Sequence, residues 1–213
     1  MARVIRMDPG HSAYLLWADS IGRYAILPHQ FADRQYKVRD SLVGAVYKVG
    51  EEFSMLSQSS MHYFRRIAEL VLAPVLANDH VQIKRVATAQ AASFVKVAVD
   101  SHRTGEDVIA ACKPFLSEFR TYTSRTIALV KYHQELDLYI REALSPAPSR
   151  SVRRVDVYRE EHQARVVVER GTIAQFLGRK GMNAAVASKL TGYGLLLVDE
   201  SELGMVSGAQ WRR

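Results

Sequence analysis

The sequence predicts a multidomain protein of the β plus α+β class, in which a small barrel of short strands precedes two units that share one order of elements. Residues 1–60 hold five short runs of β-forming residues separated by turn signals. Residues 61–132 and 133–202 each show the order helix, strand, strand, helix, helix, strand. The second of these units also contains a basic turn bounded by glycines, Gly178-Arg179-Lys180-Gly181.

Composition limits the classes of function. A chain of 213 residues can hold more than one small domain, and its 48% hydrophobic content is ample for buried cores. The formal net charge of +7 favours anionic partners without distinguishing RNA, DNA and acidic proteins. No apolar run approaches the ~20 residues that span a bilayer, and the N-terminus lacks the apolar core of a signal peptide. We therefore expect a cytoplasmic protein with no membrane partner.

The single cysteine, Cys112, excludes an intrachain disulfide, which fits a reducing compartment. Its neighbours Ala110, Ala111 and Phe115 are apolar. A buried structural thiol is therefore predicted rather than a nucleophile.

The N-terminal strands are predicted at residues 3–7, 11–18, 23–27, 41–49 and 52–56, with Asp8-Pro9-Gly10 closing the first. So many short strands in residues 1–60 indicate a small closed barrel of the OB type. Barrels of this class bind single strands by stacking bases on surface aromatic side chains. The candidates are Tyr24 and Phe31, each of which fits the surface as well as the core, and with less support Tyr14 and Trp17.

The first α+β unit, residues 61–132, begins with a helix at 61–76 that Ser59 or Ser60 caps and Pro74 ends or kinks. Strands at 81–87 and 93–99, a helix at 106–111 with Thr104 as its cap, and a strand at 125–132 follow. We expect its basic residues to form a solvated face. These residues are Lys84, Arg85, Lys96, Lys113 and Arg120.

The second unit, residues 133–202, is predicted to contain a helix at 134–144, strands at 151–158 and 164–169, two short helices around the glycine-bounded turn, and a strand at 195–198. Gly192 occupies the position of a helix C-cap glycine. The tail, residues 203–213, has no pattern that indicates a partner.

The turn Gly178-Arg179-Lys180-Gly181 suits the backbone of a single-stranded nucleic acid. Glycines at both ends allow a close backbone approach, and the N-terminus of the following helix offers N–H groups to a phosphate. Two adjacent helices and this loop form the arrangement of a type II KH domain, with bases lying along a groove beside Ile173 and Leu177. A chance pair of glycines is the alternative, whereas a Walker loop is disfavoured because Lys180 is followed by glycine.

Arg153 and Arg154 either extend the phosphate track or mark an exposed strand end. In contrast, the first unit has Ala-Ala-Cys-Lys-Pro-Phe-Leu at 110–116, where the loop should be. We therefore expect the first unit to be a degenerate KH domain with a structural role.

Residues 151–200 resemble the second KH domain of the NusA family of bacterial transcription elongation and termination factors, with Tyr193 in place of the family's tryptophan. The positions that match the family motif are Gly171, Ala174, Gln175, Gly178, Arg179, Gly181, Asn183, Ala187, Ser188, Leu190, Thr191 and Gly192. Residues 25–28 and 38–49 are similar to the S1 domain that precedes the KH pair in that family, and 110–116 lacks the loop of the family's first KH domain. Through this match Asn183 joins the predicted RNA-binding residues.

The resemblance implies a single-stranded RNA-binding protein that modulates elongation, termination or antitermination by holding nascent RNA. It implies RNA polymerase or other transcription factors as further partners, although the given sequence begins at the barrel and not at the family's polymerase-binding domain. An RNA-binding factor of translation or RNA processing, and a protein-interaction module that has lost much of its RNA binding, remain alternatives. The seven histidines are scattered and the paired carboxylates fall at turns, so no enzyme, cofactor, metal or small-molecule substrate is predicted.

Overall fold

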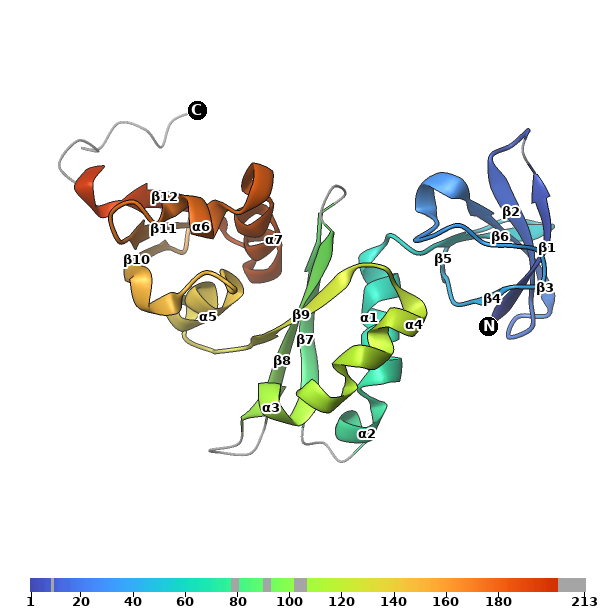
Figure 1. Ribbon diagram of the computed structural model, residues 1–213, viewed down its shortest axis with the longest axis horizontal. Helices are drawn as coiled ribbons and strands as arrows, with labels where there is room; N and C mark the ends of the chain where they lie inside the picture. Colours follow the sequence, from blue (N-terminus) through green and yellow to red (C-terminus); the bar gives the residue numbers. More distant parts are fainter. Residues whose placement is uncertain (9, 78–80, 90–92, 102–106, 203–213) are drawn as a thin grey trace. The chain divides into compact units, whose positions relative to one another are not determined.

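The structure, a computed structural model, describes residues 1–202 except 9, 78–80, 90–92 and 102–106. It divides into two compact units. The N-terminal unit comprises Met1–His80 and Ala110–Ile127, and the C-terminal unit comprises Val81–Ile109 and Ala128–Arg213 (Figure 1). The segment predicted as the first KH domain, 61–132, thus contributes to both units, and the predicted domain boundaries stay predictions. Pro9, Thr104 and the tail 203–213 lie outside the described residues.

The N-terminal unit contains one sheet with the strand order β4-β1-β2-β3-β6-β5. The strands are β1 (Ala2–Asp8), β2 (Ala13–Ala18), β3 (Arg23–Pro28), β4 (Ser41–Leu42), β5 (Ala45–Val49) and β6 (Phe53–Ser57). The pair β3–β6 is parallel, and the other pairs are antiparallel. Leu16, Leu27 and Leu56 form part of its buried core.

The strand predicted at 41–49 is broken, so the sheet has six strands where we expected five. Its first part, β4, pairs with β1, and its second part, β5, pairs with β6. Gly44 lies at the break, where a Cβ would meet the Leu56 side chain at 3.2 Å. Glycine therefore allows the backbone to cross closely over the core side chain at the point where the segment changes partner.

The helical segment predicted at 61–76 consists of α1 (Met61–Val71) and α2 (Ala73–Leu76), with Pro74 in the first turn of α2. Ser60 caps α1, as predicted, by accepting a hydrogen bond from Tyr63 N at 3.2 Å. The helix predicted at 106–111 is α3 (Val108–Cys112), and it continues into η2 (Lys113–Glu118) and α4 (Phe119–Tyr122). No glycine-bounded turn interrupts residues 108–122, in agreement with the sequence.

The N-terminal unit joins its sheet to α4 through polar contacts. Arg34 donates to Thr121 O at 2.9 Å, while Asp33 accepts from Thr123 Oγ1 and Ser124 N. The Tyr63 hydroxyl donates to Tyr122 O at 2.5 Å. These bonds tie the loop after η1 (His29–Phe31) to the end of α4.

The C-terminal unit contains two three-stranded sheets, with orders β7-β8-β9 and β10-β11-β12. Their strands are β7 (Val81–Thr88), β8 (Phe94–Ser101), β9 (Thr126–Lys131), β10 (Val152–Tyr158), β11 (Gln163–Val168) and β12 (Gly194–Asp199). The helices are α5 (Leu136–Ala143), η3 (Ser149–Ser151), α6 (Ile173–Leu177), η4 (Arg179–Gly181), α7 (Met182–Thr191) and η5 (Glu200–Glu202). The strands and helices predicted for residues 133–202 are confirmed, including Gly192 as the C-cap of α7 at a φ of 82°.

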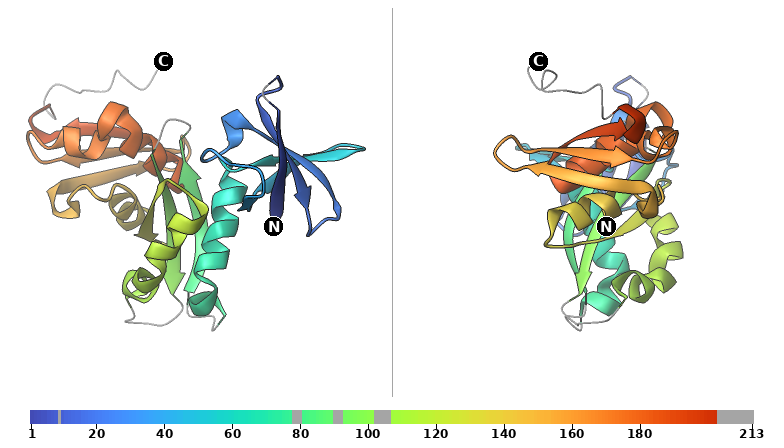
Figure 2. Two further views of the ribbon diagram at one scale, coloured as in Figure 1. Left: turned by 45° about the vertical axis from the view of Figure 1, so that its right-hand side comes forward. Right: turned by 90° about the vertical axis from the view of Figure 1, so that its left-hand side faces the viewer.

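One hydrophobic core serves both sheets of the C-terminal unit. It combines Ala87, Ala98 and Val130 of the first sheet with residues of α5, α6, α7 and the second sheet. Helix α7 packs against β7 and β8 (Figure 2). Polar contacts follow the same path, because Arg85 donates to Leu190 O and Thr191 O and so satisfies carbonyls at the C-terminal end of α7.

The prediction of a solvated basic face is wrong for Lys96, which is completely buried. Lys96 lies on the opposite face of β8 from its neighbours Val95 and Val97. All three are buried because both faces of this strand are covered. Lys113 and Arg120 are exposed, as expected.

None of the helices in the described part of the chain is both long and apolar enough to cross a membrane.

Cys112 is completely buried, as predicted, and this burial raises the pKa of its thiol to about 11. We expect native protein at pH 8 to react with a disulfide reagent only as fast as it unfolds, because the thiolate is both scarce and inaccessible. The reaction rate, followed with and without denaturant, checks this. A Ser117→Cys variant, which places a thiol on exposed η2, should react at once; equally fast reaction of Cys112 would contradict the buried position.

Candidate nucleic-acid interface

The glycine-bounded turn connects α6 to α7 through a backbone that ordinary residues rarely adopt. Gly178 ends α6 with φ 68° and ψ −177°, and Gly181 precedes α7 with φ 72° and ψ 7°. Between them Lys180 also has a positive φ, 53°. Gly181 N donates to Gly178 O at 3.1 Å, which closes the turn. Because the first of these conformations is almost exclusive to glycine, the sequence pattern fixes the path of the loop.

Gly178 is also needed for space. A Cβ at this position would lie 2.8 Å from the Asn183 Cβ and 3.3 Å from the Asn183 N. The start of α7 therefore packs directly against the backbone of the turn. The two ends of the loop are held together by contact as well as by the hydrogen bond.

The turn carries an exposed positive charge. Arg179 and Lys180 are both exposed, and neither belongs to an ion pair among the residues that the structure describes. Helix α7 has no side-chain N-cap, so the N–H groups of its first turn are not satisfied by a capping side chain. Two exposed cations beside a helix N-terminus without a side-chain cap are an arrangement that attracts anions such as phosphate.

Asn183, predicted as an RNA-binding residue, lies inside the protein. Its Nδ2 donates to Phe176 O at 2.9 Å and to Leu144 O at 2.8 Å, and its Oδ1 accepts from Lys96 Nζ at 2.6 Å. With only 6% of its surface exposed, its amide is used within the protein. The residue is placed to hold the turn, and it does not present its side chain to a ligand.

Helix α6 presents an apolar edge beside the turn. Phe176 is completely buried and anchors the helix, Ile173 is half-buried, and Leu177 is 38% exposed. The start of the helix is fixed from β12, because Gly171 N donates to Asp199 Oδ2 at 2.7 Å. The predicted groove residues Ile173 and Leu177 thus both lie on α6, the short helix that the basic turn directly follows.

Arg153 and Arg154 are exposed but engaged with carboxylates. Arg153 Nη2 lies 2.9 Å from Glu169 Oε1 and its Nε lies 3.2 Å from Glu200 Oε2. Arg154 Nε lies 3.0 Å from Asp156 Oδ1. Their charge is therefore partly balanced within the protein, unlike that of the turn.

The aromatic candidates of the N-terminal unit differ in exposure. Tyr24 is 49% exposed and lies edge-on to Trp17, with ring centroids 5.1 Å apart. Phe31 is half-buried against the core of this unit, and Tyr14 is buried. The sequence analysis missed Phe53, which is 40% exposed and pairs with Tyr24 across β3 and β6. Only the register of a parallel pair, which sequence alone does not give, brings Trp17, Tyr24 and Phe53 into one row.

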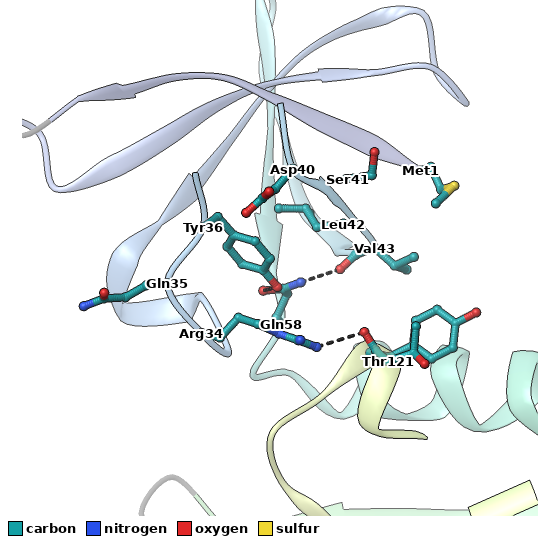
Figure 3. Close-up of a pocket in the computed structure, with 11 residues that line it drawn as sticks. Met1, Arg34, Gln35, Tyr36, Asp40, Ser41, Leu42, Val43, Gln58 and Thr121 are labelled. Atoms are coloured by element: carbon teal, nitrogen blue, oxygen red, sulfur yellow. Dashed lines mark hydrogen bonds between the residues drawn. The ribbon is translucent and has the colours of Figure 1, made fainter. Parts of the chain in front are cut away.

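The N-terminal unit also holds a pocket of about 260 Å³ (Figure 3). Gln58 donates to Val43 O at 2.7 Å and accepts from the Tyr36 hydroxyl at 2.9 Å, while Arg34 binds Thr121 O. Gln58, Tyr36 and Arg34 thus each have a hydrogen-bond partner within this unit. Among the described residues, no group of three or more His, Cys, Asp or Glu side chains is arranged to hold a metal ion.

The architecture defines a multidomain protein of mixed sheets and helices that contains a KH-like domain with an intact G-x-x-G turn. Residues 136–204 match the family model described as the NusA-like second KH domain. Relatives named transcription termination/antitermination protein NusA match most of the chain. The protein from Halalkalibacterium halodurans is 28% identical over 84% of this chain and 48% of its own length. The protein from Mycobacterium bovis is 28% identical over 78% and 48%, and that from Thermus thermophilus is 32% identical over 56% and 31%.

Residues 136–204 thus resemble the second KH domain of NusA, and the chain spans about half the length of the first relatives it matches. Among solved structures, the crystal structure of APE1850 aligns with 62% of this chain and 96% of its own, at 15% identity and a TM-score of 0.41, a likeness that does not define a fold.

The geometry of the turn predicts unequal costs for two glycine substitutions. Gly178→Ala would force alanine into a backbone conformation that only glycine adopts easily and would place its Cβ 2.8 Å from the Asn183 Cβ. We therefore expect it to lower the free energy of unfolding by about 3 kcal/mol or more. Gly181→Ala meets no atom within 4 Å and should cost about 1–2 kcal/mol, the strain of its left-handed backbone alone. Urea unfolding of both variants measures the difference, and equal costs would mean that the turn does not pack against Asn183.

Proposed function

We propose that this chain binds single-stranded RNA through the turn at residues 178–181 of its C-terminal unit and performs no chemistry. The observation that carries the proposal is an exposed pair of cations, Arg179 and Lys180, on a backbone held in place by buried contacts of Asn183. Because the turn is already in one shape, it loses little conformational entropy when a ligand such as the RNA backbone binds, and the affinity for that ligand is higher.

In this proposal the sugar–phosphate backbone lies against the turn. Arg179 and Lys180 neutralise phosphates, and the positive end of the α7 dipole adds to their attraction, although the N–H of Met182 itself already donates to Arg179 O. Bases then extend along the apolar edge at Ile173 and Leu177. Arg153 and Arg154 contribute less, because a phosphate would have to compete with Glu169, Glu200 and Asp156 for them. Asn183 acts from behind the turn by fixing its shape.

The N-terminal unit supplies the second element of the proposal. A parallel β3–β6 pair, together with a segment 41–49 that pairs with β1 at one end and β6 at the other, supports an OB barrel of the S1 kind with its fourth strand interrupted. On this surface Tyr24, with Trp17 and Phe53, offers faces on which bases can stack. Phe31, half-buried against the core, has the smaller role.

The degenerate KH-like segment serves as structure in this scheme. Its helical stretch 108–122 has no turn that could hold a phosphate backbone, whereas its strands β7 and β8 pack against α7. Similarity to proteins named transcription termination/antitermination protein NusA supports a role in transcription, with nascent RNA as the ligand and RNA polymerase or another transcription factor as partner. That role is proposed for a chain that spans about half of its first relatives.

The RNA proposal is tested by reversing the charge of the turn. Arg179→Asp with Lys180→Asp should weaken binding of a single-stranded RNA at least tenfold, because attraction to phosphates becomes repulsion. The wild-type affinity should also fall with salt, at about 0.7 log units per log unit for each phosphate neutralised. Fluorescence anisotropy measures both. The matched control combines Lys113→Asp with Arg120→Asp, which makes the same charge change on two exposed residues of the helical stretch 108–122. Equal losses in the two variants would replace the specific site with diffuse charge.

The transcription proposal predicts that the chain is retained by core RNA polymerase and that an RNA transcript increases the retention. Pull-down with polymerase alone, polymerase with transcript, and ribosomal subunits measures this preference. Retention by ribosomal subunits alone would favour a role in translation. Retention by polymerase that the Arg179→Asp and Lys180→Asp changes and added RNA leave unaltered would favour a protein-interaction module.

A further inference from the structure

The most unusual group in the C-terminal unit is the ammonium of Lys96, which strand β8 carries into the core beside α5 and α7. The residue has no exposed surface. Its Nζ donates to Ser145 O at 2.7 Å, to Asn183 Oδ1 at 2.6 Å, and to Ala143 O. Burying a charged group without partners is very costly, so a site of this kind persists only when every donor is satisfied.

The number of acceptors matches the protonated side chain. An ammonium has three N–H donors, and the three oxygens come from the C-terminal end of α5, the segment after it, and α7. Burial lowers the pKa of Lys96 to about 7. An apolar side chain of the same length would leave all three oxygens without their donor.

The partner that matters for the turn is Asn183. Lys96 holds its Oδ1, which leaves its Nδ2 oriented toward Phe176 O at the end of α6 and Leu144 O after α5. The same residue packs against Gly178, where a Cβ would clash with it. A chain of direct contacts therefore runs from β8 through Asn183 to both sides of the glycine-bounded turn.

We propose that Lys96 is a positioning residue for RNA binding: the sheet of the degenerate KH-like segment holds the phosphate-binding turn of the next domain in its binding shape through the Lys96–Asn183 hydrogen bond. This inference rests on the proposed RNA function. It gives the sheet β7-β8-β9 an indirect role in ligand binding, because Lys96 acts through Asn183 and does not contact the ligand itself.

The test is Lys96→Met, which keeps the length of the side chain and removes its donors. We expect the affinity for single-stranded RNA to fall about tenfold, and the amides of Gly178 and Gly181 to exchange with solvent faster than in the wild type. Two controls accompany it. Lys84→Met removes a half-exposed lysine from the adjacent strand, and Tyr139→Phe removes a buried hydrogen bond to Leu190 O at the far end of α7. Neither should change the affinity or the exchange of the turn, although Tyr139→Phe lowers stability.

A charge-removal background separates this inference from the RNA function itself. In a variant with Arg179→Ala and Lys180→Ala, adding Lys96→Met should weaken RNA binding no further but should still speed amide exchange in the turn. If Arg179→Ala with Lys180→Ala leaves the affinity unchanged, the proposed function fails, and the exchange data alone still decide whether Lys96 positions the turn.

The inference is overturned if folded Lys96→Met binds RNA and protects the turn as the wild type does, or if Tyr139→Phe has the same effect on both. Lys96→Gln, whose amide keeps two donors, serves if the methionine variant does not fold, and an intermediate loss is then expected. Failure of both variants to fold would make Lys96 a residue of stability and not of position, and would also overturn the proposal.

Discussion

The C-terminal unit depends on the requirement that a buried ammonium be fully hydrogen-bonded. Lys96 can remain in the core only while Ala143, Ser145 and Asn183 present their oxygens to it together. Those oxygens belong to separate parts of the fold, so one side chain sets the spacing of β8, the end of α5 and the start of α7. Ala98, Phe176 and Leu190 belong to the hydrophobic core of the same unit, so apolar packing supplies the remaining cohesion.

The basic turn is a consequence of the same arrangement. Its glycines allow the required backbone angles but do not by themselves fix where the loop lies. The loop is held because Asn183 bonds to Phe176 O and Leu144 O and packs against Gly178. Arg179 and Lys180 then remain exposed and free of acidic partners within the described part of the chain. The buried hydrogen bonds of Asn183 and the two exposed cations of the turn are the features on which the proposed phosphate-binding site rests.

The two three-stranded sheets of the C-terminal unit differ in the segments that accompany them. The sheet β10-β11-β12 is accompanied by the turn with both glycines, whereas the stretch 108–122, which lies between β8 and β9 in the sequence, contains no such turn. The sheet β7-β8-β9 shares a hydrophobic core with the segment that carries the turn and satisfies the C-terminal carbonyls of α7 through Arg85. This sheet therefore contributes to the packing of that segment.

The sequence by itself determined the order of helices and strands, the glycine-bounded turn, the cap at Ser60, the missing loop at 110–116 and the burial of Cys112, because each depends on local chemistry or on a short repeating pattern. Only the tertiary structure decided that Lys96 and Asn183 are buried and hydrogen-bonded within the protein. Both are polar residues that a pattern assigns to solvent or ligand, and only the meeting of β8, α5 and α7 gives them partners inside. The break of 41–49 and the row of Trp17, Tyr24 and Phe53 were likewise decided by strand pairing, since register depends on contacts between residues far apart in the chain.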